Sequence, residues 1–136
     1  RREVWTTAAP VVVAKDGATI GLHPPEPEDG LTLRASYILD YGATAPIPRQ
    51  SFTLTVTPGA FAREVAGCRT FLLAAEADAL RAQGVGTHLT PAELLVFGPR
   101  GPVDNALRYA DEPARHKVLD LVGDLALCGF DLVGHV

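Results

Sequence analysis

The sequence contains no methionine, only two cysteines and no long apolar run. Two cysteines cannot build a disulfide scaffold, so Cys68 and Cys128 are interpreted as small buried residues of a reduced, cytosolic protein. No segment has the pattern of a secretory signal or a transmembrane helix. Because the chain lacks an initiating methionine and stops within the apolar run Leu132-Val133, we expect it to be a piece of a longer polypeptide.

The chain also lacks an excess of positive charge. It has 16 acidic residues against 12 lysines and arginines, for a net charge of −4, which argues against a general nucleic-acid binder. A local basic cluster could still bind an anionic ligand. No internal repeat or low-complexity segment is visible. With 136 residues and 47% hydrophobic composition, the chain is predicted to form one domain over residues 1–136 with a substantial core.

The most informative stretch runs from residue 109 to residue 129 and has the features of one complete helix. Asp111 is a plausible N-cap, and Glu112 and Pro113 suit the first turn, where a carboxylate meets the positive end of the helix dipole. Gly129 stands where a helix often ends.

This helix has two dissimilar faces. One face follows the i, i+3, i+4, i+7 pattern of packing on a core. Its residues are Val118, Leu121, Val122 and Leu125. The opposite arc of about 100° is polar. Its residues are His116, Lys117, Asp120 and Asp124. His116 and Asp120 are an i, i+4 pair that could hold a metal ion, although such a pair is more often a hydrogen-bonded couple on a solvated face.

The rest of the chain mixes strand and helix signals without regular alternation. Strands are predicted over residues 4–7, 11–13, 19–22, 31–41, 51–57 and 94–97, and helices over 58–66 and 76–83. The turn at residues 15–18 makes a hairpin, and the strands 31–41 and 51–57 make an antiparallel pair. We therefore expect an α+β, two-layer sandwich: a mostly antiparallel or mixed sheet, two main helices on one face, and a small β-α-β-like insertion at about 71–103.

Several motifs together resemble one known family. They are Arg115-His116-Lys117-Val118-Leu119-Asp120-Leu121-Val122-Gly123-Asp124-Leu125, the preceding Leu107 to Glu112, Phe61 to Val65, Arg69-Thr70-Phe71, the loop Gly84 to Gly86, and Gln50. The chain resembles the zinc-dependent UDP-3-O-acyl-N-acetylglucosamine deacetylases of lipid A synthesis, over nearly all of its length, as the second (C-terminal) of that family's two domains. The resemblance implies hydrolysis by water of an N-acetyl group on a UDP-linked sugar.

The resemblance also implies roles for individual residues. His116 and Asp120 resemble two ligands of the zinc ion, and Lys117 resembles a residue that faces the substrate's diphosphate and supports catalysis. Asp124 resembles the partner of a catalytic histidine, and Thr70 a hydroxyl that stabilises the oxyanion. Three more residues, Asp40, Tyr41 and Phe71, fall where the family contacts its substrate, and the insertion is similar to the family's acyl-chain passage.

This set of residues is incomplete as an active site. In the family, the third zinc-binding histidine and the glutamate base lie in the first domain. The catalytic histidine that Asp124 would contact lies in a Gly-His pair shortly beyond the position of Val136. Gly134-His135 falls too early to be that pair, so His135 is interpreted as a strand residue. The chain alone is therefore expected to be inactive. The alternative is a non-catalytic α+β binding module in which His116, Asp120 and Asp124 face solvent, away from Thr70 and from any groove.

Overall fold

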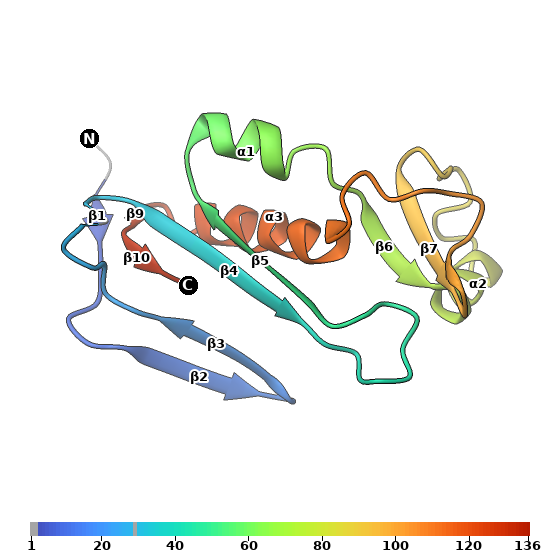
Figure 1. The fold of residues 1–136 in the computed structure, drawn as a ribbon, viewed down its shortest axis with the longest axis horizontal. Helices are drawn as coiled ribbons and strands as arrows, with labels where there is room; N and C mark the ends of the chain where they lie inside the picture. The colour runs from blue at the N-terminus through green and yellow to red at the C-terminus, as the bar shows by residue number, and fades with distance from the viewer. Residues whose placement is uncertain (1–2, 29) are drawn as a thin grey trace.

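The computed structural model describes residues 3–28 and 30–136 (Figure 1). Its helices are α1 (Pro58–Glu64), α2 (Ala74–Ala82) and α3 (Glu112–Ala126). Its strands are β1 (Val4–Trp5), β2 (Val11–Lys15), β3 (Ala18–Leu22), β4 (Leu33–Leu39), β5 (Gln50–Thr55), β6 (Thr70–Leu73), β7 (Leu94–Gly98), β8 (Gly101–Pro102), β9 (Asp131–Leu132) and β10 (Gly134–His135). The architecture is α+β, as predicted.

The central sheet has the strand order β10-β4-β5, in which β4 and β5 are antiparallel and β10 is parallel to β4. The alternation along β4 places Ala35 and Leu39 on the inner face, and Ala35 pairs directly with Leu54 of β5. Figure 1 shows α1 and α3 on one side of this pair of strands. The two main helices therefore cover one face of the sheet, as the sequence predicted.

The hairpin β2–β3 extends the central sheet on the side of β10. Its turn uses Asp16 at φ 51° and Gly17 at φ 81°, the left-handed pair that an Asp-Gly hairpin turn requires. An isolated antiparallel bridge joins His23 to His135, with N–H···O distances of 2.8 and 3.0 Å. His135 is thus a strand residue, which confirms its interpretation from the sequence.

The helices begin where local chemistry favours them. Thr57 caps α1 by accepting a hydrogen bond from the N–H of Ala60 at 3.2 Å, and Pro58 occupies the first turn. In α2 the carboxylate of Glu76 accepts a bond from the N–H of Leu73 at 2.9 Å. The helix α2 consequently starts at Ala74 instead of the predicted residue 76.

The insertion is a compact β-α-β unit. β6 and β7 are parallel, α2 connects them, and β8 adds an antiparallel edge to β7. Figure 1 shows this unit at the end of α3 where that helix begins. The predicted insertion at about 71–103 therefore corresponds to a separate three-stranded sheet, β6-β7-β8, with its own helix α2.

The apolar core consists of two clusters. One joins the insertion to β4 and the loop after it and contains Leu39, Ile47, Phe71, Leu95 and Phe97. The other lies between the central sheet and the helices α1 and α3 and contains Ala35, Leu54, Val65 and Val118. The ring of Tyr37 packs against both clusters, so the two are continuous.

Two further local predictions differ from the structure. The helix α3 ends at Ala126, because its last turn tightens to i→i+3 bonds from the N–H groups of Leu127 and Cys128 at 3.1 Å. Gly129, at φ 81°, follows that turn. Cys128 is consequently exposed, so its assignment as a buried residue is wrong, whereas Cys68 is buried and both thiols are free. None of the helices in the described chain has the length and apolar character needed to cross a bilayer.

Candidate functional site

The first residues of β6 meet the first turns of α3. The hydroxyl of Thr70 lies 3.2 Å from Nε2 of His116, although the two residues are 46 positions apart in the sequence. The ring of Phe71 stands edge-on to the His116 ring, with 6.2 Å between centroids and an interplanar angle of 79°. The structure thus brings together a hydroxyl and an imidazole that the sequence places far apart.

Two further polar groups of α3 continue this cluster. Asp120 Oδ1 lies 3.4 Å from Nε2 of His116, and its Oδ2 accepts a hydrogen bond from Nζ of Lys117 at 3.2 Å. The Lys117 ammonium also lies 5.6 Å from the centroid of the Phe71 ring. The side chain of His116 is only 11% exposed, against 42% for Asp120. A uniformly solvated helix face does not account for this burial or for the contact with Thr70.

The polar face of α3 borders an open pocket of about 370 Å³. Its lining residues are Tyr37, Lys117, Asp120, Leu121 and Asp124. Asp124 is exposed and lies one helical turn beyond Asp120. Asp124 therefore lines the same pocket as Lys117 and Asp120, but it is not among the residues described above as contacting His116.

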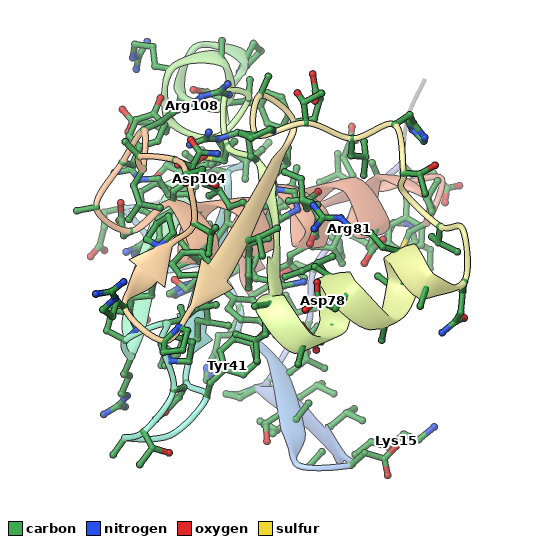
Figure 2. The ribbon with its side chains drawn as sticks, turned by 90° about the vertical axis from the view of Figure 1, so that its right-hand side faces the viewer. Lys15, Tyr41, Asp78, Arg81, Asp104 and Arg108 are labelled. Atoms are coloured by element: carbon green, nitrogen blue, oxygen red, sulfur yellow. The ribbon has the colours of Figure 1, made fainter. Side chains whose placement is uncertain are left out.

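Asp40 and Tyr41 lie at the end of β4, beside a second pocket that they line with residues of the hairpin turn. Asp40 accepts the N–H of Gly42 at 2.8 Å and pairs with Arg49 at 3.4 Å. Burial raises the pKa of the Tyr41 phenol, the nearby Lys117 ammonium opposes this rise, and Glu76 adds to it. In Figure 2, Tyr41 lies below α2, toward the hairpin β2–β3. Tyr41 is thus within electrostatic range of Lys117, whereas Asp40 is held in its own loop.

An ion pair directly behind the cluster was not found from the sequence. The side chain of Glu112 has no solvent exposure, and its oxygens accept bonds from Nε of Arg69 at 2.9 Å and Nη2 of Arg69 at 3.0 Å. Burial raises the pKa of Glu112, but hydrogen bonds from Arg69 and Arg108 outweigh burial, so the pKa lies below its ordinary value. Both residues lie in motifs that carry the family resemblance, Arg69-Thr70-Phe71 and Leu107 to Glu112, but nothing in the sequence pairs them with each other.

A second contact fixes the start of α3 to the central sheet. The side-chain oxygen of Gln50 in β5 accepts a hydrogen bond from the N–H of Ala114 at 3.0 Å. Ala114 lies in the first turn of α3, where backbone N–H groups have no partner within the helix. Gln50, which is one of the residues of the family resemblance, therefore attaches the first turn of α3 to β5.

The pair His116 and Asp120 fits the donor arrangement of a metal site. Two ligand atoms on a tetrahedral zinc ion, with bonds of about 2.0–2.1 Å, lie about 3.4 Å apart, and Nε2 and Oδ1 are 3.4 Å apart. Nδ1 of His116 is buried and has no hydrogen-bond partner among the described residues, so contacts at Nε2 orient the ring. No cluster of three or more His, Cys, Asp or Glu side chains in residues 3–28 and 30–136 could hold a metal ion. His116 and Asp120 are thus a pair of possible donors and not a complete metal site among the described residues.

This arrangement suits the stabilisation of negative charge on a substrate. The Thr70 hydroxyl, next to His116, and the Lys117 ammonium, next to Asp120, are both hydrogen-bond donors. Donors fixed before the reaction stabilise a developing oxyanion more effectively than mobile water does. The site thus combines a potential metal pair with two hydrogen-bond donors, the Thr70 hydroxyl and the Lys117 ammonium.

Comparison with known proteins agrees with the motifs. The model of one family, described as UDP-3-O-acyl N-acetylglycosamine deacetylase, matches residues 1–136. The UDP-3-O-acyl-N-acetylglucosamine deacetylase of Solibacter usitatus is 39% identical over 137 residues, covering 100% of this chain and 44% of that protein. The corresponding protein of Oleidesulfovibrio alaskensis is 36% identical over 135 residues, covering 98% and 42%. That of Thermosynechococcus vestitus is 44% identical over 111 residues, covering 82% and 36%. The chain spans less than half the length of these relatives.

Proposed function

This chain belongs to the UDP-3-O-acyl N-acetylglycosamine deacetylase family, and on that premise we propose that it is the second-domain half of a hydrolase that releases acetate from UDP-3-O-acyl-N-acetylglucosamine. The reaction would be the committed step of lipid A synthesis and would take place in the cytoplasm. The observation that supports it most directly is the meeting of the Thr70 hydroxyl, the His116 imidazole and the Asp120 carboxylate at one point.

His116 and Asp120 are the residues that would hold a zinc ion. Zinc, when bound, acts as a Lewis acid and makes water nucleophilic near neutral pH. Catalytic zinc sites use three protein ligands, so the third ligand would come from the first domain, outside residues 1–136. The general base would come from the same place, and the isolated chain is expected to lack activity.

The other residues of the cluster would act on the substrate. The Thr70 hydroxyl would donate a hydrogen bond to the oxygen of the N-acetyl group as negative charge develops on it. Lys117 would offset the charge of the diphosphate, and its contact with Asp120 keeps its ammonium group at the edge of the pocket. Asp124 would orient and charge a histidine supplied from outside the chain. Asp40, Tyr41 and Phe71 would bound the rest of the substrate.

The test uses the full-length polypeptide that contains this chain. Acetate release from UDP-3-O-acyl-N-acetylglucosamine and bound zinc are measured for the wild type and for H116A and D120A. Because each substitution removes one ligand atom, we expect zinc content to fall and activity to drop by more than about 100-fold. E28Q, which changes an exposed carboxylate in the loop before β4, is the control and should retain both. Full zinc content and activity in H116A would refute the assignment.

A further inference from the structure

We propose that Arg69 and Glu112 form a positioning pair that sets the Thr70 hydroxyl against the His116 imidazole. This inference rests on the proposed function, because it gives these two residues a task in the reaction. Neither Arg69 nor Glu112 reaches the pocket; both are buried behind it. They would act through the residues that stand next to them in the sequence and on the helix.

The hydrogen bonds of this pair are saturated. Arg69 has five side-chain N–H groups, and five acceptors lie around them. They are Glu112 Oε1 at 2.9 Å, Glu112 Oε2 at 3.0 Å, Asn105 Oδ1 at 2.9 Å, Ala106 O at 2.8 Å and Pro91 O at 3.2 Å. Glu112 in turn accepts four bonds, since the backbone N–H groups of Arg69 and Arg108 reach it at 3.1 and 2.7 Å. Each bond has a direction, so the pair permits only one relative placement of β6 and α3.

The residues of the site follow directly from this placement. Thr70 is the next residue after Arg69, whose own backbone N–H is bonded to Glu112. His116 stands four positions after Glu112, one turn further along α3. The Arg69–Glu112 pair and the Thr70–His116 contact of 3.2 Å thus join β6 to α3 at consecutive turns of the helix.

The imidazole depends on this contact for its orientation. Nδ1 of His116 has no hydrogen-bond partner in the described part of the chain, so its ring is held by Thr70 and Asp120 at Nε2 and by packing on Phe71. A buried apolar pair of the same volume would stabilise the fold as well as this ion pair does, but it would not fix the register of the strand against the helix. Register is the property that the site needs.

The decisive experiment is a double-mutant cycle in the full-length protein. R69K keeps the charge but replaces the planar five-donor fork with three donors, so it loosens the attachment. T70V removes the hydroxyl. We expect R69K to lower kcat for acetate release by about 10- to 100-fold with little change in KM, as for residues that orient reacting groups. In the T70V background, R69K should lower kcat by less than about threefold, because the hydroxyl that it positions is already absent.

The matched control is R115K. Arg115 lies in α3 and forms ion pairs with Glu64 and Asp111, so R115K makes the same change of side chain in another ion pair. All variants are assayed at a temperature where circular dichroism shows them folded. R115K should leave kcat unchanged. Multiplicative effects of R69K and T70V, or an equal loss of kcat in R115K, would overturn the proposal.

A second measurement separates this inference from the proposed function. In the metal-free protein, the ring nitrogen signals of His116 are recorded by NMR for the wild type, R69K, T70V and R115K. R69K and T70V should both shift the Nε2 signal, and R115K should not. A wild-type protein that releases no acetate would refute the proposed function, whereas an unshifted Nε2 signal in R69K would refute the positioning pair.

Discussion

Glu112 keeps its negative charge although its side chain has no solvent exposure. An isolated carboxylate in such a place would take up a proton, because removing its charge from water is costly. The four hydrogen bonds that it accepts, two of them from the Arg69 guanidinium, reverse this tendency. The pKa of Glu112 is lowered as a result, so the ionised residue stabilises the fold.

The lowered pKa predicts a specific pH dependence of stability. Between the folded pKa of Glu112 and its higher unfolded value, the unfolded chain binds more protons, so the free energy of unfolding falls as the pH falls. The contribution of Glu112 is fully present above the unfolded pKa and is lost as the pH passes down through the folded pKa. Urea unfolding of the chain and of E112Q from pH 7 to pH 3 should therefore show a shallower acid decline for E112Q. Parallel curves for the two proteins would contradict this prediction.

Elements that depend on local sequence were predicted well. The hairpin β2–β3 follows from Asp16-Gly17, and α3 follows from its apolar spacing, which needs no knowledge of distant residues. Contacts between distant residues were not accessible in this way. Arg69 and Glu112 are 43 positions apart, and Glu112 was interpreted only as a charge at the helix start. His116 and Asp120 were paired from spacing alone, but Thr70 was joined to them only through the family resemblance.

The strand β10 depends on a glycine at its first position. Gly134 has φ 134°, and a Cβ there would lie 2.3 Å from the carbonyl oxygen of His23, in the bridge that joins the hairpin to the central sheet. We expect G134A to lower the free energy of unfolding by at least about 1–3 kcal/mol, from backbone strain alone. Urea denaturation measures the change.

Gly123 provides the matched control for this substitution. It lies inside α3, and nothing is within 4 Å of the position of its Cβ. G123A should therefore raise the free energy of unfolding by roughly 0.5–1 kcal/mol, because alanine loses less backbone entropy in a helix. If G134A were as stable as the wild type, β10 would not hold the hairpin to the sheet in the way described.

At the scale of the whole molecule, the site lies where the two core clusters meet. Phe71 belongs to the cluster that joins the insertion to β4. Its ring packs against His116 of α3, the helix that contributes Val118 to the other cluster. Tyr37 contacts both clusters. Movement of the insertion relative to α3 would separate Thr70 from His116, so the geometry of the site requires that the two clusters behave as one core.

This requirement predicts that the two clusters unfold together. Leu95 of β7 is fully buried in the cluster that joins the insertion to β4, and L95A should cost about 2–5 kcal/mol by removing packing and leaving a cavity. Trp5, the only tryptophan, lies in β1, at the end of the molecule opposite the insertion (Figure 1). In a cooperative domain, L95A should shift the urea midpoint of Trp5 fluorescence and that of hydrogen exchange in β6 and β7 by the same amount. If β6 and β7 lose exchange protection while the fluorescence midpoint stays unchanged, the insertion unfolds on its own. The central sheet would then not fix the position of Thr70.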